Sequence, residues 1–344
     1  MKKMIHIAGL VLALSMFASC NQHPAAETSE TTADTASSSD VSGTGETAAD
    51  KELTDEPDYE TFEAYMREND IASRIASHGN VQVDTYFYVD EKQVGHSIFY
   101  QDSDISVDML ETVDLGLLTR DKMLFGDIVD GEEQYVIVLF DDSISYSDFF
   151  DNCMNYGLIT FVESETLIET SVKDDGTFVA VSEQHDPNYT VNEMRYYDSM
   201  GIGFDVETAY IRFTYVFNNE THDILSVEMT FIGPDEEIYV SERSEYSYGI
   251  KPYDIYDKDG YYADYLNALD DPEKTRNVTL IFAPGTEDES VLEYTVVNYT
   301  KILVTHQGVS MYDLYTDPEC TAEYDAESDN GTDDLTLYIT AVVE

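Results

Sequence analysis

The sequence predicts an α+β protein that is mainly antiparallel β. Apolar and polar residues alternate with a period of two along most of the chain after residue 80, and Asn, Asp and Gly turn signals separate the alternating segments. The chain contains 27 Tyr and 15 Phe but no Trp, and both aromatic types favour strands. A length of 344 residues is enough for two folded domains.

The charge balance of the chain is extreme. It has 71 Asp and Glu against 17 Lys and Arg, which gives a formal net charge of -54. Such a charge repels phosphate backbones, so we expect no nucleic-acid partner, and it keeps an exported protein soluble. It would also attract cations or a basic partner.

The first twenty residues have the layout of an export signal. Two lysines precede an apolar run that is too short for a permanent membrane helix, so residues 1–19 are predicted to be a signal peptide. Small residues then precede Cys20, which resembles a bacterial lipoprotein signal, although Phe17 replaces the usual Leu. The resemblance implies that Cys20 carries palmitate and anchors the chain to the extracellular face of the cell membrane of a Gram-positive bacterium. An ordinary cleaved signal with an incidental cysteine is the alternative.

Residues 20–56 are predicted to be the lipidated cysteine and a disordered acidic linker. Ser, Thr, Ala, Glu and Asp dominate this segment, and it has almost no apolar residue whose burial could offset the entropy of ordering. A flexible chain of this length spans roughly 30–36 Å, which would clear a layer of lipid headgroups.

Residues 57–250 are predicted to form one antiparallel β domain with an N-terminal helix. The spacing of apolar residues predicts a single amphipathic helix over 57–77, with Pro57 in its first turn. Alternation then predicts a meander of short strands, at 81–89, 94–100, 105–109, 117–125 and 135–140.

Further elements follow this meander. Residues 145–155 predict a short helix capped by Ser145 or Ser147, and another short helix is expected at 190–199. The Asp-Asp-Gly sequence at 174–176 predicts a hairpin between strands at 157–172 and 177–184.

The clearest hairpin is at 208–232, with Asn218 and Asn219 as the expected turn, and a third strand is predicted at 237–246. Alternate residues of its strands share an apolar face: Ala209, Ile211, Phe213, Tyr215 and Phe217 on the first, and Leu225, Val227, Met229 and Phe231 on the second.

This order of elements, with the hairpin YVFNNETHDILSVEMTF, resembles the LolA/LppX-like lipoprotein-carrier architecture over about residues 57–250. The resemblance implies a curved antiparallel sheet that cups a lipid against covering helices. A generic sheet covered by a helix is the alternative. We single out Phe213, Phe217 and Phe231 as the residues to mutate if a lipid is bound.

Residues 251–275 are predicted to be a connector with a helical turn or two over 261–269, and 276–344 a small β-rich domain. Within the latter, LYTDPECTAEYD and DDLTLYITAV resemble a divergent single copy of the Listeria–Bacteroides repeat of bacterial surface proteins. The usual Gly-Trp is replaced by Asp313-Leu314, and the final Trp by Val342. The resemblance implies a small β-grasp-like unit that serves as a spacer or adhesive module without catalytic residues.

The sequence shows no arrangement typical of catalysis or cofactor binding, so we expect no enzymatic activity, cofactor or resident metal. The seven histidines are scattered, and His96 and His185 are interpreted as structural or exposed. The acidic segment 254–264 fails the EF-hand template, and a looser oxygen-ligand site there is a weaker alternative. Cys153 and Cys320 are expected to stay unpaired, although an exported protein could join them.

Two functions remain open. The first is a monomeric, membrane-anchored, non-catalytic binding module for a lipid or another apolar ligand. The second is an adhesive or structural surface protein that acts through its C-terminal repeat-like unit. An envelope enzyme whose site follows no motif is a third, weaker interpretation.

The predicted linker has a testable consequence. Limited proteolysis of the exported chain should leave a stable core that begins near Asp55–Tyr59, because a disordered linker exposes its backbone to the protease. N-terminal sequencing of the resistant fragment checks this, and a resistant fragment that begins well before residue 50 would contradict the predicted linker.

Overall fold

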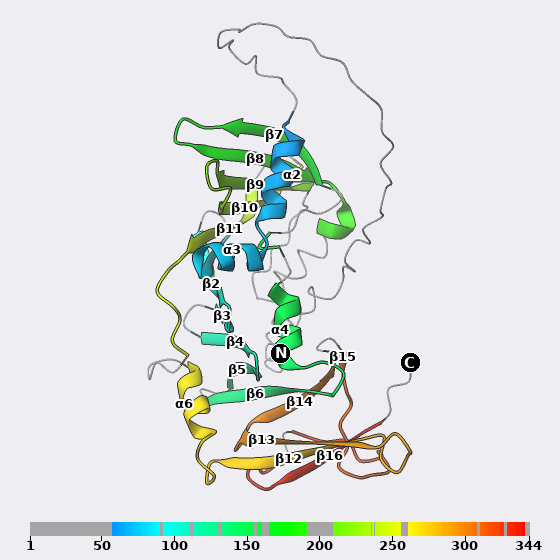
Figure 1. Cartoon of the computed structure of the whole chain (residues 1–344). Coiled ribbons are helices and arrows are strands. Elements are labelled where there is room, and N and C mark those ends of the chain that lie inside the picture. The colour runs from blue at the N-terminus through cyan, green and yellow to red at the C-terminus, as the bar shows by residue number, and fades with distance from the viewer. Residues whose placement is uncertain are drawn as a thin grey trace, which may run out of the picture.

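The structure is a computed structural model that describes residues 57–89, 92–110, 113–129, 132–154, 157–159, 165–190, 209–234, 236, 238–255, 261–307, 310–326 and 329–340. Two sheets dominate these residues. A 13-stranded sheet has the order β15-β14-β6-β5-β4-β3-β2-β1-β11-β10-β9-β8-β7, and a 3-stranded sheet has the order β13-β12-β16. The large sheet runs along the length of the molecule, with α2 and α3 near one end and the small sheet at the other (Figure 1). The prediction of a mainly antiparallel β protein with covering helices is confirmed.

The first half of the chain forms two helices and a six-strand meander. Each strand pairs antiparallel with the next one, as predicted for a meander. The single strand predicted at 117–125 is wrong, because a turn closed by the hydrogen bond from the Thr119 amide to the Lys122 carbonyl divides it into two paired strands. These elements are α2 (Tyr59–Glu68), α3 (Ile71–His78), β1 (Asn80–Val89), β2 (Lys92–Asp102), β3 (Ile105–Leu110), β4 (Val113–Thr119), β5 (Met123–Val129) and β6 (Glu132–Phe140).

The second half begins with a helix and adds a five-strand meander. The Ser145 hydroxyl accepts a hydrogen bond of 3.0 Å from the Asp148 amide, which confirms the predicted cap. The elements are α4 (Tyr146–Met154), β7 (Glu165–Val172), β8 (Thr177–Gln184), β9 (Tyr210–Asn218), β10 (Ile224–Ile232) and β11 (Ile238–Tyr248). Strand β11 then pairs antiparallel with β1, from Val81 opposite Tyr248 to Val89 opposite Val240, and so joins the two meanders into one sheet.

The C-terminal residues are divided between the two sheets. They form α6 (Tyr261–Ala268), β12 (Thr275–Phe282), β13 (Ser290–Val297), β14 (Lys301–His306), β15 (Ser310–Met311) and β16 (Leu335–Ile339). Strand β14 pairs parallel with β6 and extends the large sheet, whereas β12 pairs with β13 and, in parallel, with β16. The expected small β-grasp-like unit is therefore not confirmed, because two of its strands, β14 and β15, belong to the large sheet.

The large sheet buries apolar side chains on both faces. One face packs against the small sheet and α6, through residues such as Val107, Leu117 and Leu280. The opposite face is covered by α2 over strands β7–β10 and by α4 over β4–β6. Alternate residues of each strand thus contribute to different cores, as expected for a sheet covered on both sides.

The predicted helix over 57–77 is wrong in one respect, since the chain forms two helices there. Asn69 ends α2, and the Asp70 carboxylate accepts a 2.7 Å hydrogen bond from the Ser73 amide at the start of α3. Asn and Asp compete with helical hydrogen bonds and favour caps, so the Asn-Asp pair breaks the helix although the apolar spacing continues.

The predicted hairpin at 208–232 is confirmed, with two local differences. The connection runs over residues 219–223 rather than over Asn218 and Asn219 alone, because the Asn218 side chain accepts hydrogen bonds from the Glu220 and Thr221 amides. A register shift between Ile224 and Ser226 then places Ile224, rather than the predicted Leu225, in the core of this face.

Other predictions fall outside the described residues. These are the signal peptide, Cys20 with the linker up to residue 56, most of the helix expected at 190–199, and residues 256–260 of the acidic segment. No helix within the described ranges is long and apolar enough to cross a membrane.

A buried ion pair fixes the C-terminal loop to β12. The Arg276 side chain is 1% exposed and donates hydrogen bonds of 2.9 and 2.8 Å to the two oxygens of Asp329. Tyr324 donates to the same carboxylate at 2.8 Å. Burial raises the pKa of Asp329, but these hydrogen bonds and that from the Gly331 amide outweigh it and lower the pKa to about 2.

Asp329→Asn should lower the free energy of unfolding by about 3 kcal/mol at pH 7, because it leaves the buried Arg276 guanidinium without a counter-charge. The folded pKa lies below the ordinary value, so the wild-type advantage should be complete above about pH 4 and disappear as the pH falls towards 2. Urea unfolding followed by circular dichroism measures the free energy of unfolding at each pH. Glu287→Gln, a change at an exposed residue, is the control. Equal stability of the two variants at pH 7 would contradict this role.

Candidate functional site

The best candidate for a binding site is the sheet face beneath α2. We call the aromatic side chains there the aromatic layer: Phe62 and Tyr65 from α2, and Phe178, Phe213, Tyr215, Phe217 and Phe231 from β8–β10. The three phenylalanines singled out from the sequence all belong to it: Phe213 is 7% exposed, and Phe217 and Phe231 are 0% exposed. The structure therefore brings them together beneath α2.

The helix and the sheet meet through closely packed rings. Phe62 lies 5.3 Å from Tyr215 and 6.2 Å from Phe217, measured between ring centroids. Tyr65 lies 5.1 Å from Phe178 and 5.5 Å from Phe217. Tilted and edge-to-face pairs at these separations are favourable beyond the area that they bury. The layer is thus closely packed, as an ordinary core would be.

Two hydrogen bonds near solvent join the N-terminal end of α2 to β7. The Asp58 amide donates to the Thr170 hydroxyl at 2.7 Å, an exposed contact. Tyr59, which is 46% exposed, donates to the Leu167 carbonyl at 3.2 Å. Exposed hydrogen bonds contribute little net free energy because water replaces them readily.

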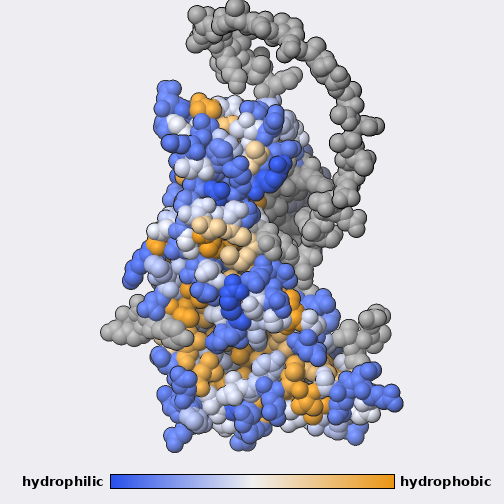
Figure 2. Space-filling view, viewed as in Figure 1, coloured by the Kyte–Doolittle hydropathy of each residue, from blue (hydrophilic) through white to orange (hydrophobic). Residues whose placement is uncertain are grey.

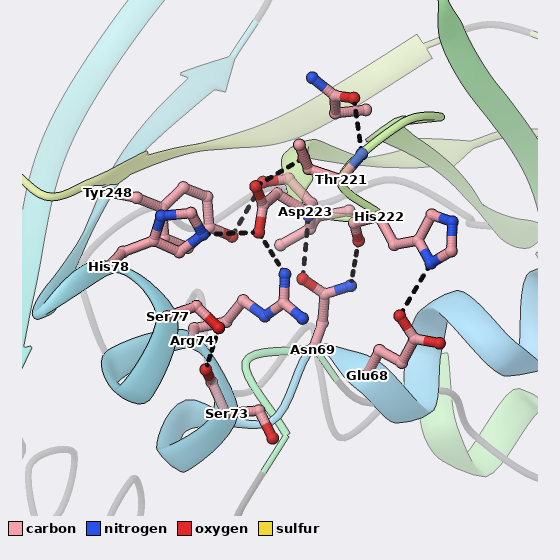
Figure 3. A network of polar contacts seen from close by, with 12 residues as sticks. Glu68, Asn69, Ser73, Arg74, Ser77, His78, Thr221, His222, Asp223 and Tyr248 are labelled. Atoms are coloured by element: carbon pink, nitrogen blue, oxygen red, sulfur yellow. Dashed lines mark hydrogen bonds and ion pairs between the residues drawn. The ribbon is translucent and has the colours of Figure 1, made fainter.

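The C-terminal end of α2 is held by a network of polar side chains (Figure 3). We call this network the latch, and its members are Asn69, Arg74, His78, Thr221 and Asp223. Asn69 is 0% exposed; its side-chain amide donates to the Tyr65 and His222 carbonyls, both at 2.7 Å, and its oxygen accepts from the Ile224 amide at 2.9 Å. One side chain thus satisfies backbone groups of α2 and of the β9–β10 connection at once.

Asp223 is the charged centre of the latch. Its carboxylate pairs with Arg74 of α3, and the two side chains are each 9% exposed. It also accepts from Thr221 at 2.7 Å and lies 3.0 Å from His78 Nε2. Burial raises the pKa of Asp223, but the hydrogen bonds from Thr221, His78 and Arg74 outweigh burial and hold the pKa below its ordinary value.

A second pair lies at the edge of the latch. His222 Nδ1 is 2.8 Å from Glu68 Oε2, and the His222 ring stacks on Tyr65 with a centroid separation of 4.2 Å. Neither His222 nor Asp223 stood out in the sequence. In the sequence, His222 and Asp223 are only polar residues of a predicted turn. No local pattern shows which helix packs over that turn.

The two histidines interpreted from the sequence as structural or exposed lie at separate positions. His96 lies on β2, 3.0 Å from the Asp84 carboxylate, and stacks on Tyr86 at 4.5 Å. His185 follows β8 and lies 3.1 Å from Glu183. Within the described ranges the side chains that these histidines contact are carboxylates and tyrosines, and no group of three or more His, Cys, Asp or Glu is arranged to hold a metal ion. No disulfide joins Cys153 and Cys320.

The C-terminal motif residues make structural contacts. Asp317 accepts hydrogen bonds from the Glu319 and Thr321 amides, each at 3.1 Å, and so closes a turn. Tyr315 exchanges two backbone hydrogen bonds with Tyr338 of β16, at 3.0 and 2.8 Å. These contacts fix the loop between β15 and β16 against the small sheet.

Comparison with known proteins gives little further information. No protein-family model matches the chain, and no curated protein matches its sequence. Among solved structures, the chain is similar to a LolA superfamily protein, NE2245, from Nitrosomonas europaea. The TM-score is 0.22 and the identity 11%, over 58% of this chain and 97% of that chain. A similarity this low supports no functional argument, so the proposal below rests on the residues of this chain.

The latch predicts a measurable effect on α2 and α3. Asp223→Asn should raise the amide hydrogen-exchange rate of residues 57–78 at least tenfold at pH 7, because Arg74 then remains buried beside an uncharged partner. Since the folded pKa of Asp223 is lowered, the wild-type protection should be present above about pH 4 and decline as the pH falls through the folded pKa.

The matched control for this measurement is Glu220→Gln, which removes an exposed charge from the same connection. Exchange that is equally slow in both variants would show that the Asp223 charge does not hold the helices.

Proposed function

We propose that this chain is a membrane-anchored extracellular lipoprotein that binds a lipid or another apolar ligand between its sheet and its helical cover, and that it catalyses no reaction. The observation that supports this most is the aromatic layer beneath α2. A single ten-residue helix covers a broad buried aromatic face and is fastened firmly at only one of its ends.

The free energies make such binding feasible. Helix α2 buries mainly Phe62 and Tyr65, and complete burial of two such side chains stabilises the closed state by about 3–6 kcal/mol. A lipid chain gains about 0.8 kcal/mol for each methylene that it buries. The burial of about eight methylenes would therefore offset the free energy lost when these two side chains leave the sheet. A longer acyl chain would gain more free energy than is lost.

The two ends of α2 define the direction of opening. The latch holds its C-terminal end through Asn69 and, by way of α3, through Asp223. The N-terminal end depends on the exposed contacts of Asp58 and Tyr59. We therefore propose that α2 acts as a flap that lifts at its N-terminal end.

The position of the flap in the chain fits this role. Residues 20–56 precede α2 directly, and we propose that Cys20 is lipidated and that these residues tether the body to the extracellular face of the membrane. The end of α2 that lifts would then be the end that continues towards the membrane, from which an apolar ligand would come. A monomer is sufficient for this function.

An adhesive surface role is the second candidate. Apolar side chains gather over the lower part of the molecule, around α6, β6 and the small sheet (Figure 2). Val291 of the edge strand β13 is 51% exposed. A surface of this kind favours contact with another protein over enclosure of a ligand.

Photo-crosslinking distinguishes the two functions. A soluble form that begins at Asn21 is incubated with a diazirine-labelled fatty acid and irradiated, and labelled peptides are mapped by mass spectrometry. Labels should concentrate on α2 and β8–β10, and Phe62→Ala should increase labelling several-fold because it removes packing that holds the flap closed.

Leu280→Ala is the matched control, since it removes a buried apolar side chain from the core on the opposite face of the sheet and should leave labelling unchanged. Labelling confined to β13 and its neighbours would favour the adhesive surface, and an absence of labelling would refute the lipid-binding proposal.

A further inference from the structure

A row of side chains crosses the large sheet between the two helical covers. Residues directly opposite one another in neighbouring strands share a face, and the register places seven residues in one such row. They are Tyr246 of β11, Val83 of β1, Phe99 of β2, Asp108 of β3, Gly116 of β4, Phe125 of β5 and Val136 of β6. The row connects the core beneath α2 with the core beneath α4 and continues from Val136 to Lys301 of β14. Asp108 is its only acidic member, and Lys301 lies four strands away from it.

Asp108 is buried without compensation. It is 8% exposed, and its carboxylate makes no hydrogen bond or ion pair within the described part of the chain. A methyl group on Gly116 would lie 3.5 Å from Asp108 Oδ2 and 3.6 Å from Phe125 Cε1, so the absence of a side chain there leaves room beside the carboxylate. Burial alone raises the pKa of Asp108 to about 7.

Two further polar side chains lie beside Asp108 on the same face. Ser106 precedes it by two positions on β3 and is 2% exposed, and its hydroxyl has no hydrogen-bond partner among the described residues. Gln101 of β2 lies opposite Ser106, is also 2% exposed, and donates at 2.9 Å to the Met154 sulfur at the end of α4. A thioether is a weak acceptor.

We call Asp108, Ser106 and Gln101 the central polar triplet. It lies on β2 and β3, which are seen between α3 and α4 in Figure 1. Buried polar groups are almost always hydrogen-bonded, so a carboxyl and a hydroxyl without a partner among the described residues call for one.

We propose that the central polar triplet binds the ammonium group of an apolar ligand, and this inference rests on the function proposed above. An ammonium group offers three donors and a positive charge. It could donate to the Asp108 carboxylate and to the Ser106 hydroxyl while the apolar part of the ligand lies along the adjacent Val83 and Phe99 towards the aromatic layer.

The charge of the whole chain favours the same class of ligand. A formal net charge of -54 repels anionic amphiphiles and concentrates cationic ones near the surface. Inside the sheet, an ammonium group would neutralise the one carboxylate of the row, whereas a fatty-acid carboxylate would add a second uncompensated charge. The ligand class is therefore a cationic amphiphile rather than an anionic lipid.

Isothermal titration calorimetry with three twelve-carbon probes tests the inference on the soluble form that begins at Asn21. Dodecylamine should bind more tightly than dodecanol, and dodecanoate least tightly, all below their micellar concentrations. Asp108→Asn should weaken dodecylamine binding about tenfold or more and leave dodecanol binding unchanged, because hydrogen bonds to charged groups are the stronger ones. Ser106→Ala should weaken dodecylamine binding about fivefold.

Two controls keep the result interpretable. Glu228→Gln removes one charge from an exposed position of β10 and should leave dodecylamine affinity unchanged. Asp108→Asn should raise the melting temperature at pH 8 and change it little at pH 3. The folded pKa lies above the ordinary one, so the wild type loses stability as the pH rises from about 4, where the unfolded carboxyl ionises, to about 7, where the folded one does. This readout shows that the variant is folded.

The outcomes separate this inference from the function on which it rests. Binding of dodecanol and dodecylamine with equal affinity, or dodecylamine binding that Asp108→Asn does not weaken, would overturn the ammonium site and leave the apolar site standing. Absence of binding by all three probes would overturn both.

Discussion

The pairing of β1 with β11 is the constraint on which the rest of the structure depends. These strands are separated by about 150 residues of chain, and their pairing places β1 in the middle of thirteen strands. Closing so long a loop costs conformational entropy, which local hairpins do not have to overcome. Once the pair forms, two independent meanders become one continuous surface, and one face can extend from the aromatic layer to the core beneath α4.

Because this face is continuous, different helices cover different parts of it. Helices α2 and α4 each cover one part of it, while the small sheet and α6 cover the opposite face. The small sheet has the larger apolar contact and packs as a permanent core. Helix α2 contributes two large aromatic side chains and has one weakly held end. The free energy needed to separate it from the sheet is therefore small enough for a bound ligand to supply.

The buried carboxylates of this fold differ in whether they have a charged partner. In the latch and at the C-terminal loop, Asp223 and Asp329 are each matched by an arginine and by neutral donors, and both have lowered pKa values. Asp108 has no such partners in the part of the chain that the structure describes, and its pKa is raised. Asp141 and Glu165 are also buried, and each accepts hydrogen bonds from neighbouring side chains. Among the buried carboxylates of the described residues Asp108 is therefore the exception, and unsatisfied polar groups of this kind are typical of binding sites.

The sequence by itself determined the elements of this protein. Alternation with a period of two located most strands, and Ser145 and the Asp-Asp-Gly turn located a cap and a hairpin. The face of β9 and that of β10 after its register shift followed from spacing alone. These features depend on neighbours within a few residues, so they can be inferred locally. Tertiary structure alone decided that β14 joins β6, that Asn69 and Asp223 form a latch, and that Asp108 lies in an apolar row. Each depends on partners far apart in the chain, and in a sequence with 71 acidic residues no local pattern distinguishes the carboxylates that become buried from those that stay in water.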